Sequence, residues 1–251
     1  SNLGGLIAGE LAAGSGIPAF VVDPVMVDEL CPLARYTGFP ELRRRSIFHA
    51  LNQRAVGRKA AARLGKTYSE ACLIVVHLGS GVSVGAHERG RVIDVNNALD
   101  GDGPFGVERA GGLPVSDLVR LCFSGRWTEE ELLRRVRRQG GLVGHLGLNS
   151  GREVEARIDD GDEQARECFE AMAYQIAKEI GGLAAVLKGQ VDAVVLTGGL
   201  AHSARLVGWI TERVAFLGPV LVFPGENELE ALALGALRVL RGEEPAREYR
   251  T

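Results

Sequence analysis

Two glycine-rich turns are the parts of this sequence best suited to hold a phosphorylated ligand. The first, HLGSG at residues 77–81, follows the apolar run Leu73–Val76 and precedes alternating apolar residues that predict a hairpin. The second, TGGL at residues 197–200, ends another apolar run and precedes a predicted helix from Ser203. Backbone N–H groups in a glycine turn or at a helix N-terminus bind phosphate. Two such turns at strand ends indicate a nucleotide lying across the open end of a sheet.

Three titratable or charged side chains are candidates for chemistry beside these turns. Asp23 interrupts the apolar run Ile17–Val27, either as a buried carboxylate that holds a metal or a proton, or as the cap of a turn. His49 lies among apolar residues of a predicted helix, where a lone histidine is more often part of the core. Arg109 precedes two glycines that leave room for an anion, although a surface ion pair would use the same residue.

Other motifs in the sequence are excluded by their context. The run GDGPFG at 101–106 fits the dinucleotide fingerprint G-x-G-x-x-G, but Pro104 breaks the turn that the fingerprint needs. The run GVSVG at 81–85 fits the nucleophile elbow of serine hydrolases, but Ser83 alternates with valines as in a strand. No Walker A motif occurs, and the histidines lack zinc-ligand spacing.

Composition predicts an ordinary globular protein. The 251 residues are 46% apolar and 24% charged, with a net charge of -3 that favours neither nucleic acid nor an anionic membrane as a partner. The four cysteines are widely spaced, which predicts buried free thiols in a reducing compartment, so we expect a cytoplasmic protein. No apolar run is long enough to cross a bilayer.

Strands alternate with helices after an initial meander, which predicts an α/β fold with a mixed sheet. We expect an amphipathic helix before Gly14, a strand at 17–27, and a helical stretch at 28–66 that Pro40 divides, with its second part at Glu41–Leu64. The meander is expected at Leu73–Val76, Val82–Ala86 and Val92–Asn96. Further helices are expected at Val115–Phe123, Thr128–Arg138 with a capping box, Glu163–Leu187, Ser203–Ala215 and Glu228–Arg241, and further strands at Asp192–Thr197 and Val220–Phe223.

Taken together, these residues resemble the acetokinase family of acetate and butyrate kinases, which shares the RNase H-like fold of actin and the sugar kinases. The resemblance extends over essentially the whole chain. It is carried by IPAFVVDPV, RSIFHALNQRAVGR, HLGSGVSVGAHERGRVIDVNNALDGDGPF, ERAGGLP, LVRLCFSG, MAYQIAKEIG, VDAVVLTGGLAHS and ELEALALGALRVLRGEE. The runs SIFHALNQ and DVNNALDGDGPF favour the butyrate kinase branch.

The resemblance implies a phosphotransferase that converts ATP and butyrate into ADP and butanoyl phosphate, with Mg²⁺. By position, Asp23 matches a carboxylate that handles a proton or orients the acid, and His49 and Arg109 match the pair that stabilises the transferring phosphoryl group. Glu228 matches a magnesium-associated acid. The nucleotide-binding positions match His77, Leu78, Gly79, Ser80 and Gly81 for the phosphates, and Arg152, Gly198, Gly199, Leu200, Ala201, His202 and Ser203 for the adenosine.

The sequence departs from the family pattern in two places. Ser150-Gly151-Arg152 stands where the family usually has Asp-x-Arg near the adenine. The first strand of the family, its phosphate loop and a substrate-binding arginine are not present in the sequence. We therefore expect an N-terminally shortened chain with little kinase activity of its own, which forms a homo-oligomer through exposed apolar surface.

The expected organisation has three segments. Residues 1–27 would be a remnant of the first lobe, residues 28–227 a complete second lobe that binds the nucleotide, and residues 228–251 a closing helix that packs back toward the first lobe. Two alternative functions remain open: a kinase for a branched or other short-chain acid, and a non-catalytic nucleotide-binding or oligomerisation lobe. The expected partners are a small carboxylic acid or acyl phosphate, with neither nucleic acid nor a membrane.

Overall fold

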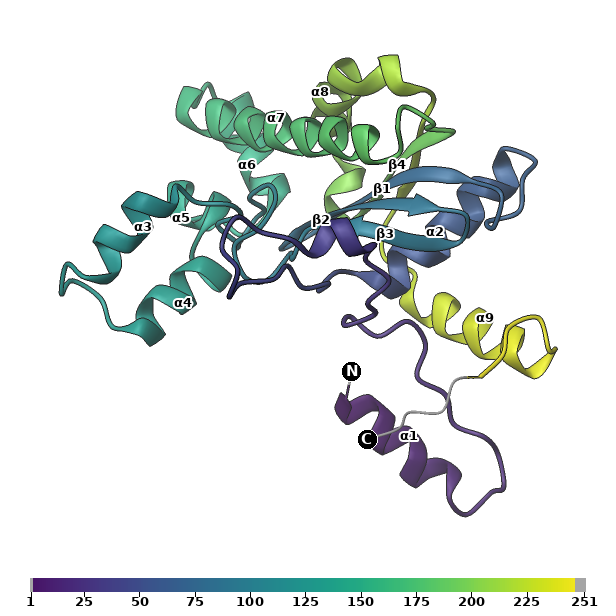
Figure 1. The fold of residues 1–251 in the computed structure, drawn as a ribbon. Helices are drawn as coiled ribbons and strands as arrows, with labels where there is room; N and C mark the ends of the chain where they lie inside the picture. The colour runs from purple at the N-terminus through teal and green to yellow at the C-terminus, as the bar shows by residue number, and fades with distance from the viewer. Residues whose placement is uncertain (1, 247–251) are drawn as a thin grey trace.

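The centre of the protein is a five-stranded mixed sheet. A computed structural model describes residues 2–246 (Figure 1). The strand order is β3-β2-β1-β4-β5, with β1–β2 and β2–β3 antiparallel and β1–β4 and β4–β5 parallel. The strands are β1 (Cys72–Leu78), β2 (Val82–Glu88), β3 (Arg91–Val95), β4 (Ala193–Gly198) and β5 (Val220–Pro224). This sheet confirms the predicted mixed α/β fold.

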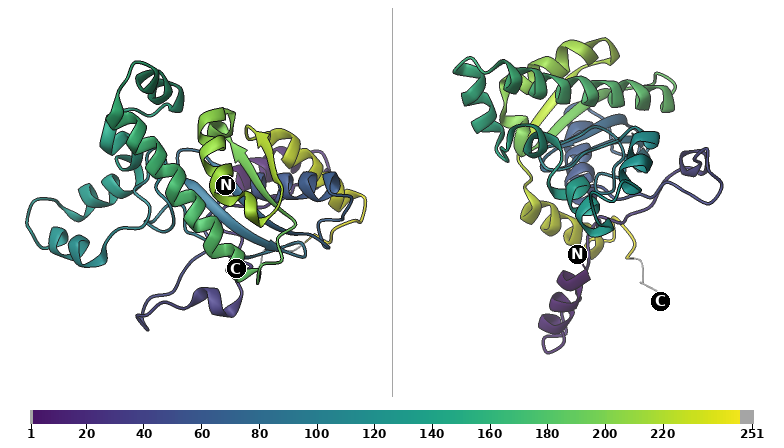
Figure 2. Two further views of the ribbon diagram at one scale, coloured as in Figure 1. Left: turned by 90° about the horizontal axis from the view of Figure 1, so that it is seen from above. Right: turned by 90° about the vertical axis from the view of Figure 1, so that its left-hand side faces the viewer.

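Helices cover both faces of the sheet, which explains why β1 and β4 are almost entirely apolar. The helices α7 (Glu163–Val186) and α8 (Ala204–Val214) lie over one face, and α2 (Ala50–Arg63) lies over the other (Figures 1 and 2). The first face packs Ile74, Val76, Val84, Val194 and Leu196 against Phe169, Met172, Ile176 and Ile180. The second packs Leu73, Val75, Ala193 and Val195 against Val56, Ala60 and Ala61 of α2.

Local signals explain where the helices begin. Asp162 caps α7 by accepting a hydrogen bond from the Ala165 N–H, and Ser203 caps α8 in the same way from the Leu206 N–H. The predicted capping box of Thr128 and Glu131 is present at the start of α4 (Glu129–Arg138). The remaining helices are α1 (Asn2–Ala12), α3 (Val115–Cys122), α5 (Gly141–Leu146), α6 (Gly151–Asp159) and α9 (Glu228–Leu240), with short 3₁₀ turns at Pro32–Arg35, Gly199–His202 and Ala215–Leu217.

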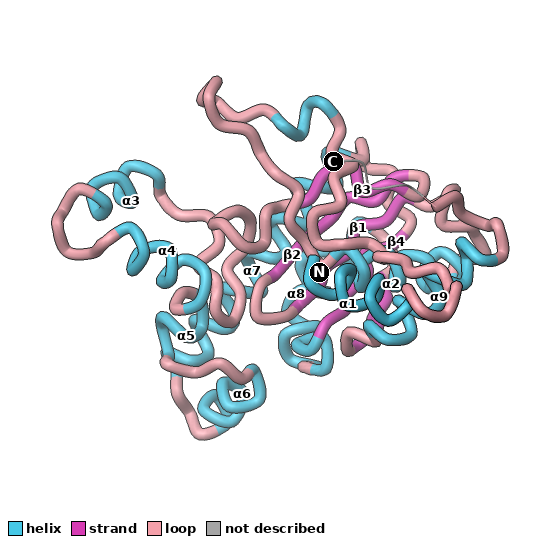
Figure 3. Tube along the Cα trace, turned by 90° about the horizontal axis from the view of Figure 1, so that it is seen from below, coloured by secondary structure: helices cyan, strands magenta, loops and turns pink. Residues whose placement is uncertain are grey.

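Two parts of the chain extend away from the sheet. The helices α3 and α4 form an arm at one end, which Figure 3 shows from below. Helix α1 stands apart from the sheet in Figure 1 and in the right view of Figure 2, and its Leu3, Leu6 and Leu11 are 69–78% exposed. Helix α9 packs against α2 and approaches Val22 so closely that a Cβ on Gly235 would overlap it. Among residues 2–246, no helix has both the length and the apolar character needed to cross a bilayer.

Two predicted elements are wrong. Residues 17–27 form no strand, and the helical stretch predicted at 28–66 contains only the 3₁₀ turn Pro32–Arg35 before α2 begins at Ala50. Before α2, Phe48 packs with Val92 and Val95 in a separate cluster. Tertiary contacts also hold Arg44, whose guanidinium donates to Asp94 Oδ1 at 2.8 Å. The sequence-based expectations did not include α5 and α6.

Candidate active site

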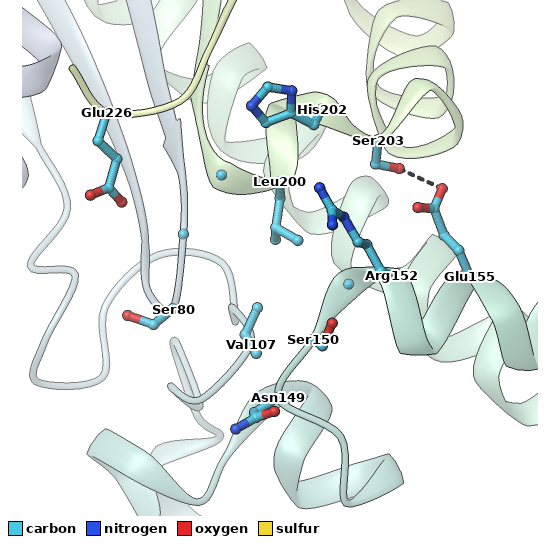
Figure 4. Close-up of a pocket in the computed structure, with 13 residues that line it drawn as sticks. Ser80, Val107, Asn149, Ser150, Arg152, Glu155, Leu200, His202, Ser203 and Glu226 are labelled. Carbon is cyan, nitrogen blue, oxygen red and sulfur yellow. Dashed lines mark hydrogen bonds between the residues drawn. The ribbon is translucent and has the colours of Figure 1, made fainter.

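A cavity of about 590 Å³ lies where the parallel strands β1 and β4 end. The two predicted turns, immediately after these strands, form one side of it, and α6 and the start of α8 form the other (Figure 4). The open carboxyl end of parallel strands is the usual ligand site in α/β sheets. The lining residues are Gly79, Ser80, Val107, Asn149, Ser150, Gly151, Arg152, Glu155, Gly199, Leu200, His202, Ser203 and Glu226.

Glycines allow the two turns to pack together while leaving the cavity open. Gly198 has φ 90°, and a Cβ there would overlap the Leu78 carbonyl oxygen, so the second turn lies directly on the end of β1. A Cβ on Gly199 would meet no atom within 4 Å. The backbone of Gly199 is therefore accessible to a ligand.

The opposite wall is built from two capped helix starts. Ser203 Oγ accepts from the Leu206 N–H at 3.0 Å and donates to Glu155 Oε1 at 2.8 Å, which joins α8 to α6. Ser150 caps α6, and Arg152 in its first turn points between the two walls (Figure 4). Figure 4 shows Ser80 and Glu226 across the cavity from Arg152. Helix N-termini on one wall and a glycine turn on the other suit a phosphorylated ligand.

Seven of the predicted nucleotide-binding residues line this cavity and five lie behind its surface. Gly79, Ser80, Arg152, Gly199, Leu200, His202 and Ser203 line it, whereas His77, Leu78, Gly81, Gly198 and Ala201 do not. Sequence reasoning missed Val107, Asn149, Glu155 and Glu226. The S-x-x-E pattern from Ser150 to Glu153 was the signal for α6, and it would have brought Glu155 into consideration.

His49 and His77 form a stacked pair of rings behind the first turn. Their ring centroids are 3.8 Å apart with an interplanar angle of 10°. Burial lowers the pKa of His49 to about 4, with a further effect from the Arg109 charge. Burial lowers the pKa of His77 to about 2, with smaller effects from His49 and Arg109. Both rings are therefore neutral at pH 7 and can each offer one N–H and one lone pair.

Arg109 lies directly against the first turn. The Glu108 N–H donates to Ser80 O at 3.0 Å, which holds the chain beside the turn. A Cβ on Gly81 would overlap the Arg109 guanidinium, whose NH1 donates to Ala98 O at 2.9 Å. Burial lowers the pKa of Arg109, and its buried Nε has no hydrogen-bond partner among the described residues. An unpaired cationic N–H beside a glycine turn is suited to an anionic oxygen.

Asp23 lies in a different place from the nucleotide turns. It borders a second cavity, of about 290 Å³, between α2, α9 and β5. Its Oδ1 is 3.1 Å from Arg54 Nε. Burial raises the pKa of Asp23, although Arg54 opposes the shift. Glu226 borders both cavities, so Asp23 is separated from the first cavity by the turn that carries Glu226.

The predicted metal-associated residue, Glu228, is the first residue of α9. It borders neither cavity, whereas Glu226 borders both. Within residues 2–246, no group of three or more His, Cys, Asp or Glu side chains is placed to hold a metal ion. Mg²⁺ in nucleotide sites is usually bound by substrate phosphates with one or two carboxylates, so a large carboxylate cluster is not required.

Comparison with solved structures shows that this fold is shared with acetate, propionate and sugar kinases. Acetate kinase from Porphyromonas gingivalis superposes with a TM-score of 0.83 at 23% identity, over 95% of this chain and 68% of that chain. A propionate kinase from Francisella tularensis gives 0.72 at 24% identity, over 81% and 60%. A putative N-acetylmannosamine kinase from Listeria monocytogenes gives 0.50 at 16% identity, over 95% and 71%. The chain thus spans between 60% and 71% of the lengths of these proteins.

The family match is more specific than the fold. The model of the acetokinase family matches residues 36–227, which include both glycine turns, the two stacked histidines and Arg109. This is well over half of the chain. The protein therefore belongs to the acetokinase family.

Proposed function

We propose that the protein is an ATP-dependent carboxylate kinase that forms acyl phosphates from short-chain acids. Membership of the acetokinase family supports this activity. The observation that carries it is the nucleotide-sized cavity at the ends of β1 and β4, lined by both glycine turns, with the Arg109 guanidinium packed against the first turn at Gly81.

In this proposal the nucleotide lies in the 590 Å³ cavity with its adenosine toward residues 199–203 and Arg152. Its phosphates lie against the turn at residues 79–81, where Arg109 reaches them from the side. The glycine turns and the N-termini of α6 and α8 supply the N–H groups for them. The residues present therefore fit a bound nucleotide.

Phosphoryl transfer from ATP to a carboxylate needs positioning and positive charge more than a strong base. The attacking carboxylate oxygen is already a nucleophile, and negative charge spreads over the equatorial oxygens of the transferring group. Arg109 would stabilise this charge with its guanidinium, and neutral His49 would donate one N–H to it. Bound Mg²⁺ would neutralise phosphate charge, and Glu228 is the carboxylate that we propose near it.

We propose butyrate as the preferred acid, on the basis of the runs SIFHALNQ and DVNNALDGDGPF. A branched or other short-chain acid is the alternative. We propose that Asp23 orients the acid or handles its proton. We also propose that residues 1–27 and 228–251 belong with a first lobe, that residues 28–227 form the nucleotide lobe, and that the protein is a cytoplasmic homo-oligomer. Ser1 and residues 247–251, which these segments include, lie outside the described residues.

The proposed activity is tested by trapping its product. Acyl phosphate formed from Mg-ATP and acetate, propionate, butyrate or isobutyrate reacts with hydroxylamine, and each hydroxamate is identified by chromatography. We expect this chain to form hydroxamate only slowly, with butyryl hydroxamate forming fastest and none when ATP is omitted. Faster formation from isobutyrate would support the branched-acid alternative. No hydroxamate from any acid, with folded protein and bound nucleotide, would contradict a carboxylate kinase and favour a non-catalytic nucleotide-binding protein.

A further inference from the structure

Two consecutive amide side chains at the start of α2 are connected by hydrogen bonds to the stacked imidazole rings. Asn52 bonds to His77, and Gln53 reaches His49 through Ser83. Asn52 is 3% exposed and Gln53 is fully buried. The hydrogen-bond directions in these two chains can be worked out because each amide also touches a backbone carbonyl, which can only accept.

The first chain determines which nitrogen of His77 carries the proton. Asn52 Nδ2 donates to the backbone oxygen of Glu226 at 2.9 Å, so Asn52 Oδ1 faces the other way. That oxygen lies 2.8 Å from His77 Nδ1 and can only accept. His77 therefore carries its proton on Nδ1. Its Nε2 has a lone pair and lies beside the first turn, where a Cβ on Gly79 would be 2.9 Å away.

The second chain determines the proton of His49. Gln53 Nε2 donates to the Ser83 carbonyl oxygen at 2.9 Å and to Ser83 Oγ at 2.8 Å. Ser83 Oγ accepts from Gln53, and among the described residues its own O–H has no acceptor other than His49 Nδ1, 2.9 Å away, so it donates there. His49 Nδ1 is thus an acceptor, and the ring carries its proton on Nε2.

The same chain continues on the far side of Gln53 and confirms its orientation. His87 Nε2 lies 3.0 Å from Gln53 Oε1 and must donate to it. His87 Nδ1 then accepts from the Tyr68 hydroxyl at 2.8 Å. Burial raises the pKa of Tyr68, so this hydroxyl keeps its proton. Each N–H and O–H group between Tyr68 and His49 therefore has one acceptor, and the backbone oxygen of Ser83, which can only accept, sets the direction of all these hydrogen bonds.

Strand β2 leaves space for the Gln53 side chain in this series of hydrogen bonds. Ser83, Gly85 and His87 alternate along β2, so they share the face that α2 covers. A Cβ on Gly85 would be 2.6 Å from Gln53 Oε1. Glycine at this position is therefore required for Gln53 to lie between Ser83 and His87.

We propose that Asn52 and Gln53 are positioning residues that fix opposite tautomers in the stacked pair, Nε2–H in His49 and Nδ1–H in His77. For the kinase reaction this inference rests on the proposed function. It assigns His49 as the ring that donates a hydrogen bond to the transferring phosphoryl group. His77 presents a lone pair at the same edge, so it does not donate to a phosphate oxygen and instead accepts from a neighbouring N–H or water.

The test is the ¹⁵N spectrum of the imidazole rings in histidine-labelled protein at neutral pH, because protonated and unprotonated ring nitrogens differ strongly in chemical shift. Single His→Gln variants assign the signals. We expect His49 and His87 as Nε2–H and His77 as Nδ1–H. In Asn52→Leu, His77 loses its acceptor and its proton should shift to Nε2, toward Glu226 Oε1 at 3.6 Å, while His49 is unchanged. Gln53→Leu is the matched control, which should alter His87 and leave His77 as Nδ1–H.

Three results would overturn the proposal. These are Nε2–H in His77 or Nδ1–H in His49 of the wild type, Nδ1–H persisting in folded Asn52→Leu, and a tautomer change of His77 in Gln53→Leu. If Asn52→Leu does not fold, the wild-type spectrum alone decides. The spectra require no turnover, so an inactive protein with the expected tautomers would contradict the kinase function and not this inference.

Discussion

The two faces of the central sheet differ in what their side chains do. The face under α7 and α8 is one continuous apolar cluster, in which Phe169, Met172 and Ile176 have no exposed surface. The face under α2 is apolar only over part of its length. Along β2, this face instead has a hydrogen-bonded chain from His87 through Gln53 to Ser83, which ends at the stacked histidines. The face under α7 and α8 mainly stabilises the protein. On the face under α2, some of the buried side chains are polar and orient one another by hydrogen bonds.

Because of this difference, we expect the free energy of unfolding to fall in acid. A buried neutral histidine opposes its own protonation, so the face under α2 favours folding only while its rings are neutral. The apolar face contains no such group among the residues of its cluster. We therefore expect low pH to act on the face under α2, and the loss of an apolar side chain to matter most on the face under α7 and α8.

The largest expected effect is a loss of stability between about pH 6.5 and 5. Burial lowers the pKa of His49, His77 and His87 from 6.5 to about 4, 2 and 3. The unfolded chain then binds more protons than the folded protein, so the stabilisation is complete above pH 6.5 and declines as pH falls toward the folded values. As pH falls from 6.5 toward 5, the three rings give a slope that rises to about 4 kcal/mol per pH unit. Urea unfolding at a series of pH values measures it.

A single variant separates this effect from general acid unfolding. His87→Gln should reduce the slope by about a third, since each ring contributes about 1.4 kcal/mol per pH unit. Asp23 and Glu179 have raised pKa values, so their protonation favours the folded protein and acts in the opposite sense as pH falls. An unchanged slope in His87→Gln would contradict the assignment to buried neutral rings.

The second effect concerns the apolar face. Phe169 has no exposed surface and meets Trp209 edge-on, with ring centroids 6.0 Å apart. Phe169→Ala should lower the free energy of unfolding by about 3–5 kcal/mol, from lost transfer energy and a cavity. Phe123→Ala, at a side chain that is 88% exposed, is the matched control and should change it by less than about 0.5 kcal/mol. Denaturant titration measures both, and equal effects would contradict the role of this face.

The third effect concerns turnover. Arg109→Ala should lower kcat for acyl phosphate formation about 10²–10³-fold, because a donor to the transferring group is lost. The Kd for Mg-ADP should change less than about threefold, since this donor acts mainly in the transition state. Arg120→Ala, on the exposed surface of α3, is the control and should change neither. Equal losses in kcat and nucleotide affinity would show that Arg109 binds the ground state.

Much of the fold could be predicted from sequence patterns that lie within a single helix or strand. The spacing of Phe169, Met172 and Ile176 predicted α7 because a long amphipathic stripe has few other solutions. The capping box predicted the start of α4. The strand at 17–27 was wrong because an apolar run does not by itself supply a neighbouring strand, and this segment instead lies near α9.

The candidate site was predicted in part, for a similar reason. Glycine turns after strands are local signals, and the structure brings Gly79, Ser80, Gly199 and Leu200 together at one cavity. The position of His49 depends on Phe48, which packs against β3, and this long-range contact is not visible as periodicity. The polar chain from Tyr68 to His49 joins three elements, so no single stretch of sequence reveals it.

The most direct test is whether a nucleotide binds between the two glycine turns. Gly199→Leu would place a side chain in the open space at Gly199, where a Cβ meets nothing within 4 Å. Gly208→Leu, on α8 with the same open surroundings, is the matched control. By calorimetry, we expect wild type and Gly208→Leu to bind Mg-ADP with the same affinity. We expect Gly199→Leu, with its fold intact, to bind Mg-ADP at least about tenfold more weakly, a difference of about 1.4 kcal/mol. Equal affinity in folded Gly199→Leu, or no binding by the wild type, would contradict this binding site.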